Sequence, residues 1–359
     1  MHGGDIYSHN IKHDFSININ PLGLPLSAQI AYLRALKKIQ NYPDQKCGAL
    51  ADALSKQLAL PEEMLVFGNG ASELIQAVLR AEKARRVLLF APCFTGYEHT
   101  IKACGAIPLY YYLNEKEDFV FGESDFDRLS DLVVREKPDF LILTNPNNPN
   151  GRIFNTKIVE KIIQLCNKSE VKLLIDECFI ELSAPEETVK SFDAAHGTPA
   201  AALTNSSAPY ILRAFTKTYA IPGLRLGYCI CPNEAAADAL KASLPEWNVS
   251  SVAQEVGLAL LKSGNYLTRA RALIRREREY LSEELKALGF EVYNSDANFI
   301  LFRDVVKETS LFKNMLSHGI LIRDCCDFEG LGEGFYRIAV KKHRENKLLI
   351  KAIKKVRGK

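Results

Sequence analysis

The chain of 359 residues has no long hydrophobic run. No stretch approaches the roughly 18 apolar residues that a membrane-spanning helix needs. Its opening, MHGGDIYSHN, lacks the apolar segment of a secretory signal peptide. Internal repeats and low-complexity tracts are absent as well. These absences predict a soluble, cytoplasmic protein with no membrane partner.

Charge of one sign is not in excess. Lysine and arginine together number 46 and the acidic residues 43, so the formal net charge is +3. Such a balance predicts no general attraction to nucleic acid or to an anionic membrane. The densest basic stretch, residues 269–278 (RARALIRRER), is interleaved with glutamate and apolar residues, and we interpret it as the solvated face of a helix.

The sequence also lacks paired cysteines. Nine cysteines are present, but none forms a C-x-x-C pair and no histidine spacing matches a metal site. An odd number of cysteines, several inside apolar runs, is typical of reduced core thiols in a cytosolic protein. We therefore predict neither a bound metal nor a disulfide framework.

Short apolar runs alternate with longer helical patterns over the first two thirds of the chain. Strands are expected at 86–92, 139–146, 171–177, 210–216 and 226–231, and helices, for example, at 71–81 and 155–168. Most of these strands are apolar over their whole length, as in strands that are covered on both faces. The predicted fold is α/β, with a largely parallel sheet between layers of helices.

The pattern changes after about residue 233. Long amphipathic segments follow, and then strand candidates at 297–302 and 335–340. This length and pattern predict two domains. The expected division is an N-terminal arm at 1–40 that is part of the small domain, a large domain at 41–235 and a small C-terminal α+β domain at 236–359.

Two polar motifs follow strands, where ligands bind in open α/β sheets. GNGASE (68–73) is a glycine-rich turn that enters a helix, and its free N–H groups with the Ser72 hydroxyl can hold a phosphate. NPNNPNG (145–151) is a rigid loop that can aim a side-chain amide. By itself, each motif is also compatible with an ordinary connection, a serine-capped glycine turn in the first case and a proline-rich loop in the second.

Charged residues follow two further strands. Asp176 ends a buried strand, where a carboxylate is costly unless a cation such as a protonated ring nitrogen meets it; a helix-capping aspartate is the alternative. Lys217 ends the next strand, and it is either a surface charge or a desolvated amine able to form a Schiff base. Arg225 could supply the neighbouring positive charge and also bind a phosphate through its forked guanidinium. Phosphate cup, aimed amide, acid and lysine together describe a pyridoxal 5′-phosphate site.

Nearly the whole chain resembles the fold-type I pyridoxal-phosphate enzymes, the aspartate aminotransferase superfamily, in the order and spacing of these motifs. The resemblance implies that Lys217 carries the cofactor as a Schiff base, Asp176 pairs with its pyridine nitrogen and Asn148 hydrogen-bonds its ring hydroxyl. The other contacts that it implies are Gly70, Ala71, Ser72, Glu73, Thr216 and Arg225 around the phosphate, and Phe94 stacked on the ring. It also implies a homodimer, in which Tyr42 reaches the partner's cofactor phosphate.

Two branches of this superfamily compete. HGGDIY with DFSININPLGLP, KTYAIPGLRLGY and GILIRDCCDFEGLGEGFYRIAV resemble the threonine-phosphate decarboxylases of cobalamin biosynthesis. They imply decarboxylation of L-threonine O-3-phosphate, or of L-serine O-phosphate, to an amino-alcohol phosphate. Histidinol-phosphate aminotransferase is the alternative, and a non-catalytic regulatory module is a third reading, against which the presence of Lys217 argues.

The substrate contacts are a hypothesis that rests on the same stretches. We expect His2, Asn18, Arg323 and Arg337 to bind the carboxylate and the phosphate of the substrate.

The sequence departs from the family pattern at three positions. Ala214 replaces a hydroxyl residue, which removes one hydrogen bond to the cofactor phosphate. Phe179 stands where many aminotransferases place a tyrosine on the ring oxygen, which favours the decarboxylase. Asn150 replaces the usual threonine of N-P-T-G.

Overall fold

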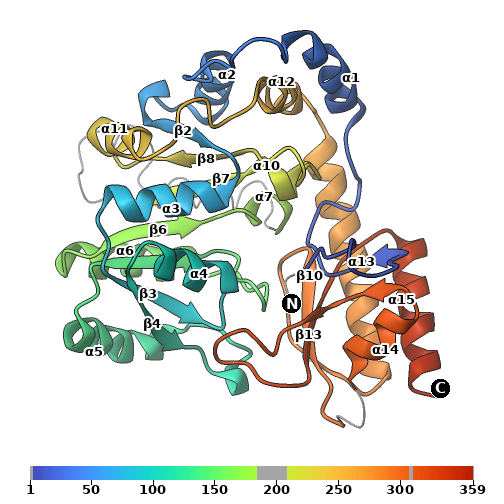
Figure 1. The fold of residues 1–359 in the computed structure, drawn as a ribbon. Coiled ribbons are helices and arrows are strands. Elements are labelled where there is room, and N and C mark those ends of the chain that lie inside the picture. The colour runs from blue at the N-terminus through green and yellow to red at the C-terminus, as the bar shows by residue number, and fades with distance from the viewer. Residues whose placement is uncertain (1–2, 184–207, 307–309, 359) are drawn as a thin grey trace.

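The computed structural model describes residues 3–183, 208–306 and 310–358 (Figure 1). Its larger sheet has seven strands, in the spatial order β2 (Leu65–Gly68), β8 (Gly227–Ile230), β7 (Tyr210–Ala214), β6 (Lys172–Asp176), β5 (Phe140–Thr144), β3 (Arg86–Ala91) and β4 (Ile107–Tyr112). Only β8 runs antiparallel to its neighbours, so the other strands share one direction. The predicted α/β fold with a largely parallel sheet is therefore confirmed.

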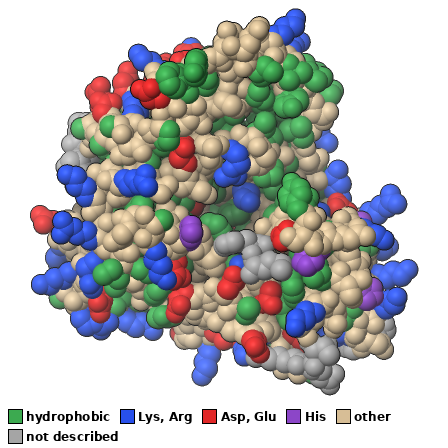
Figure 2. All heavy atoms as spheres, in the orientation of Figure 1, with side chains coloured by type: hydrophobic (Ala, Val, Ile, Leu, Met, Phe, Trp, Pro, Cys, Tyr) green, Lys and Arg blue, Asp and Glu red, His purple; other side chains and the backbone are tan. Residues whose placement is uncertain are grey.

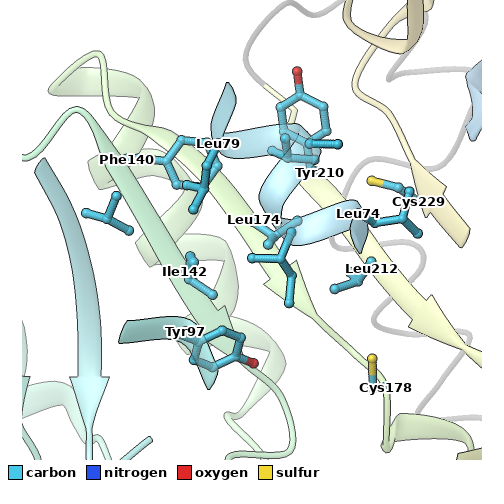
Figure 3. Packing of buried hydrophobic residues seen from close by; sticks show 14 of the residues in the cluster. Leu74, Leu79, Tyr97, Phe140, Ile142, Leu174, Cys178, Tyr210, Leu212 and Cys229 are labelled. Carbon is cyan, nitrogen blue, oxygen red and sulfur yellow. The ribbon is translucent and has the colours of Figure 1, made fainter. Parts of the chain in front are cut away.

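Helices cover both faces of this sheet. One face packs against α3 (Ala71–Ala81), α4 (Thr95–Ala103) and α11 (Glu234–Ala242), and the other against α5 (Phe126–Glu136) and α6 (Thr156–Lys168). In α3, Leu74 lies beside the strand residues Leu174 and Leu212, and Leu79 lies beside Phe140 (Figure 3). Burial on both faces explains why these strands are apolar throughout.

Further helices surround the β2 edge and connect the strands. They are α1 (Leu26–Ala35), α2 (Gly48–Leu58) and α12 (Ser251–Leu260) at that edge, with the short α7 (Ile180–Ser183) and α10 (Phe215–Thr218) after β6 and β7. Short 3-10 turns lie at Leu36–Lys38, Glu62–Met64, Glu115–Glu117 and Glu123–Asp125.

The C-terminal part builds a second, antiparallel sheet with its own core. Its strands are, in order, β12 (Arg323–Asp324), β13 (Phe335–Ala339), β10 (Phe299–Arg303) and β9 (Glu291–Val292), and its helices are α13 (Tyr266–Ala287), α14 (Leu311–Ser317) and α15 (His343–Val356). The arm joins this part, because β1 (His13–Asp14) pairs with β11 (Ile320–Leu321). The predicted limits at residues 40 and 235 stay a prediction.

All nine cysteines are free thiols, and seven of them are buried. Among the described residues, no helix is both long and apolar enough to cross a membrane.

Candidate functional site

A cavity of about 330 Å³ lies at the carboxyl ends of β5, β6 and β7, between the two sheets. Its walls on the side of the larger sheet are Ala71, Ser72, Ile75, Phe94, Thr95, Tyr97, Thr144, Asn148, Asp176, Cys178, Phe179, Thr216, Lys217 and Arg225. The arm and the smaller sheet contribute Gly3, Ser16, Ile17, Asn18, Arg323, Phe328 and Arg337. This face of the molecule is hollowed near its centre, with basic side chains beside the hollow (Figure 2). The cavity therefore brings together sequence segments from both ends of the chain.

Lys217 is presented by α10, a single turn that begins where β7 ends. The arm closes over this turn, since the Asn20 N–H donates to the Lys217 carbonyl at 3.0 Å. Burial lowers the pKa of the Lys217 amine to about 8, and the positive charges of Arg337 and Arg225 act in the same direction. An amine with this pKa is a competent nucleophile near neutral pH.

Asp176 ends β6 and is 7% exposed. Its Oδ2 accepts a hydrogen bond from the Tyr97 hydroxyl at 2.7 Å, and its Oδ1 accepts from the backbone N–H of Cys178 at 2.9 Å. Burial nevertheless raises the pKa of Asp176, because these neutral donors only partly offset desolvation. Among the described residues, no cationic side chain bonds this carboxylate, so it suits a cationic ligand.

The phosphate cup forms where β2 turns into α3. Gly70 has φ +81°, which favours glycine, and a Cβ there would lie 2.5 Å from Nη2 of Arg225 and displace the guanidinium from this position. Ala71 and Ser72 open the 11-residue helix and line the cavity, and Thr216 lines it from α10. Helix N–H groups together with a guanidinium favour a phosphate.

Glu73 is placed differently from the other cup residues. Its Oε2 accepts from the Asn69 N–H at 2.7 Å and from Asn248 Nδ2 at 2.8 Å, and it does not line the cavity. In this structure the Glu73 carboxylate stabilises the turn by hydrogen bonds outside the cavity.

Aromatic and amide groups flank the position between Lys217 and Asp176. Phe94 lines the cavity and meets Tyr97 edge to face, with ring centroids 5.5 Å apart. Asn148 accepts a hydrogen bond from Arg337 through Oδ1, which leaves its Nδ2 as a donor for a ring oxygen. Phe179, at 7% exposed, supplies an apolar wall where a tyrosine would supply a hydroxyl.

The smaller sheet contributes the anion-binding side. Arg323 on β12 and Arg337 on β13 are directly opposite each other, and both are buried. Burial lowers the pKa of Arg337 to about 10, and the charge of Arg323 acts in the same direction. The Asn18 Oδ1 atom is buried without a hydrogen-bond partner, while His2 lies outside the described residues.

These groups fit pyridoxal 5′-phosphate by their chemistry. A buried carboxylate held by neutral donors suits the protonated ring nitrogen, an amine of lowered pKa suits the aldehyde, and the glycine turn with Arg225 suits the phosphate.

Three further residues that the sequence analysis singled out do not line the cavity. Tyr42 is 80% exposed and packs on Trp247, with ring centroids 4.7 Å apart, so it does not reach the cavity of its own chain. Asn150 is buried and donates to the Phe119 carbonyl, so its departure from the family pattern is structural. Ala214 is buried in β7 and does not line the cavity.

The sequence reasoning missed Tyr97 and Thr144. The Thr144 hydroxyl donates to the Tyr97 hydroxyl at 2.9 Å, which in turn donates to Asp176. Figure 3 shows Tyr97 near the end of β5, on the sheet face covered by α3. The spacing of three between Phe94 and Tyr97 at the start of a helix is the signal that could have found it.

The chain is similar to members of one protein family whose activities are of two kinds. The pattern of the class I and II aminotransferases matches residues 10–353. The threonine-phosphate decarboxylase of Salmonella typhimurium is 31% identical over 96% of this chain and 90% of its own.

Two solved structures are similar throughout. The histidinol-phosphate aminotransferase of Clostridium acetobutylicum has a TM-score of 0.84 at 31% identity, over 96% of this chain and 98% of that one. The L-threonine-O-3-phosphate decarboxylase of Porphyromonas gingivalis has a TM-score of 0.80 at 25% identity, over 96% and 99%. Overall similarity thus leaves the choice between decarboxylation and amino transfer to the site itself.

Proposed function

Because the chain belongs to the class I and II aminotransferase family, which uses pyridoxal 5′-phosphate, we propose that it decarboxylates an O-phospho-L-amino acid. L-threonine O-3-phosphate is the proposed substrate, with L-serine O-phosphate as a smaller variant. The product is an amino-alcohol phosphate for the nucleotide loop of cobalamin.

One observation carries this proposal: two buried arginines, Arg323 and Arg337, are directly opposite each other in the cavity that holds Lys217. Like charges at directly paired positions of adjacent strands destabilise a sheet, so this pair favours a ligand with strong negative charge. A substrate that carries both a carboxylate and a phosphate supplies that charge.

Each polar residue has a defined task in this reaction. Arg323, Arg337 and Asn18 would bind the two anionic groups, and the binding energy of the phosphate would hold the carboxylate in the orientation from which it is lost. The bound cofactor supplies an electron sink for the charge left at the α-carbon. Asp176 would keep a proton on the ring nitrogen, and Lys217 would return a proton to the α-carbon.

A turnover assay tests this proposal. The purified protein, loaded with pyridoxal 5′-phosphate, is incubated with O-phospho-L-threonine and no 2-oxo acid, and carbon dioxide and amino-alcohol phosphate are measured. Both products are expected in equal amounts, and O-phospho-D-threonine should give neither. Turnover that requires added 2-oxoglutarate and yields glutamate would refute decarboxylation.

Histidinol-phosphate amino transfer is the second candidate. It is supported by the TM-score of 0.84 with the Clostridium acetobutylicum enzyme, and its substrate also carries a phosphate. In the same assay, histidinol phosphate with 2-oxoglutarate would then be the productive pair.

We also propose a homodimer. Exposed apolar side chains follow one another through α1 and the turn after it: Leu26, Ile30, Leu33, Leu36 and Ile39. Hydrophobic side chains gather over α1 in the space-filling view (Figure 2). Tyr42 lies just beyond this apolar strip, outside its own cavity, which suits a residue that serves the site of a second copy.

The oligomeric state tests the dimer. The double variant Leu33→Glu, Ile39→Glu should yield monomers in analytical ultracentrifugation. It should also weaken cofactor binding, because Tyr42 of a second copy would no longer reach the cofactor phosphate. Tyr42→Phe should weaken cofactor binding without dissociating the dimer. A monomeric parent chain that binds the cofactor normally would contradict this arrangement.

A further inference from the structure

Arg323 is already engaged by a carboxylate of its own loop. Its Nη2 donates to both oxygens of Asp327, at 2.8 and 2.9 Å, and its Nη1 donates to the Asp324 carbonyl. The guanidinium face stacks on Phe328, 4.9 Å from the ring centroid. Arg337 differs, because it donates to the neutral oxygens of Asn148 and Ser16.

The electrostatic setting explains why a carboxylate is needed there. Arg323 and Arg337 are 4% and 6% exposed, and they occupy directly opposed positions on β12 and β13. Two buried guanidinium groups in such positions repel each other, and each loses hydration. One negative charge beside Arg323 reduces this cost.

The position of Asp327 suits a charge that can leave. Its side chain is 37% exposed, whereas that of Arg323 is 4% exposed, so the carboxylate can turn into solvent while the arginine stays in place. The backbone on its C-terminal side is fixed, since Phe328 is buried and its N–H donates to the Cys325 carbonyl at 3.1 Å. Displacement therefore requires movement of the Asp327 side chain and not of the Phe328 backbone.

We propose that Asp327 is a displaceable counter-ion of Arg323, which pairs with the guanidinium before substrate binds and gives up that position to the substrate's phosphate. This inference rests on the proposed function in taking the ligand to be a phosphate ester. A phosphate dianion competes with one carboxylate for the Nη2 edge and also reaches Arg337. Weaker, singly charged ligands leave Asp327 in place, so the residue selects for strong anions.

Asp327→Asn tests the proposal, because it removes the competing charge at nearly constant size. The probe is inorganic phosphate, titrated into the protein loaded with pyridoxal 5′-phosphate at constant ionic strength, with binding followed by calorimetry. We expect phosphate to bind about threefold to tenfold more tightly, as for the loss of one partly exposed ion pair. The KM for O-phospho-L-threonine should fall by a similar factor while kcat is unchanged.

Glu329→Gln is the matched control. Glu329 lies two residues further on and accepts a hydrogen bond from the Tyr112 hydroxyl, so this variant removes one charge of the same loop without touching Arg323. Its phosphate affinity should stay that of the parent protein. In the double variant with Asp327→Asn and Arg323→Gln, the gain should disappear.

Phosphate affinity that is unchanged or weaker in Asp327→Asn would overturn the proposal and make Asp327 a residue that merely orients Arg323. The titration needs no turnover, so it separates this inference from the reaction. Tighter phosphate binding in a protein that does not decarboxylate phosphothreonine supports the counter-ion and refutes only the proposed reaction.

Discussion

Asp176, at the end of β6, and Arg337, in the middle of β13, are buried charges of opposite sign that approach one cavity from two different sheets. Their partners are of the same kind. Asp176 accepts from the Tyr97 hydroxyl and the Cys178 N–H, and Arg337 donates to the oxygens of Asn148 and Ser16. Neutral dipoles orient both charges without cancelling them, which prepares each for a charged ligand.

The residue next to Asp176 shows the opposite solution. Glu177 is also buried, but it accepts from Nη2 of Arg213 at 2.7 Å, and Arg213 is itself 2% exposed. A buried pair of this kind is closed to ligands. Two adjacent carboxylates thus have different tasks, and the difference lies in whether the protein supplies the counter-charge.

The largest expected effect belongs to Lys217, the amine between the two charged ends. Lys217→Ala should reduce turnover by about 10⁴-fold, the upper range for loss of a proton-transferring side chain. The visible absorption band of the Schiff base should also disappear. Lys56→Ala, on the exposed surface of α2, serves as the control. Persistence of the band in Lys217→Ala would contradict the assignment.

Substitution of the two adjacent carboxylates should separate activity from stability. Asp176→Asn should reduce kcat by about 10²- to 10³-fold, as for loss of a preorganised electrostatic contact, with little change in unfolding. Glu177→Gln should lower the free energy of unfolding by about 3 kcal/mol, because it leaves Arg213 without this carboxylate. Urea denaturation and kcat are measured on both variants. Equal effects of the two on stability would remove the distinction between open and closed charges.

The cationic end is tested by Arg337→Lys. Lysine keeps the charge but loses the planar fork, so the KM of the phosphorylated substrate should rise by about 10- to 100-fold, as for loss of a hydrogen bond to a charged group. Arg303→Lys is the control, since Arg303 lies in the same sheet but pairs with Glu115. An unchanged KM in Arg337→Lys would place the anion elsewhere.

Tyr97→Phe should have a smaller effect through Asp176. Loss of the 2.7 Å hydrogen bond raises the pKa of the carboxyl further, so the carboxylate pairs less well with a cationic ring nitrogen. We expect about tenfold weaker cofactor binding, the value of one hydrogen bond to a charged group. The measurement is a titration of the apoprotein with pyridoxal 5′-phosphate, and Tyr110→Phe is the control, since Tyr110 lies on β4 and does not line the cavity. Unchanged affinity would show that Tyr97 only packs.

Much of the larger sheet could be predicted from the sequence, because its strands are apolar on both faces and end in unusual polar residues. The strand predicted at 210–216 is observed at Tyr210–Ala214, followed by the turn that carries Lys217. The cofactor side of the cavity follows from these strand ends, since parallel strands bring their carboxyl ends to one edge.

The substrate side could be predicted only by resemblance. Arg323 and Arg337 become neighbours through the pairing of β12 with β13, and Ser16 reaches Arg337 from the other end of the chain. No local pattern specifies such contacts. Likewise, nothing in the sequence distinguishes Asp327 from an ordinary loop residue, and only the structure shows that it accepts a hydrogen bond from Arg323.

The smallest expected effect concerns the influence of Arg337 on the pKa of Lys217. Because this pKa is lowered from 10.5 to about 8, the neutral amine predominates only above that pH. The rate at which pyridoxal 5′-phosphate attaches to the apoprotein should therefore rise with pH and level off above about 8. The positive charge of Arg337 is one cause of the lowered pKa, so Arg337→Gln should move the midpoint upward, whereas Arg303→Gln should not. A midpoint that stays in place or falls in Arg337→Gln would show that the charge of Arg337 does not contribute to the lowered pKa of Lys217.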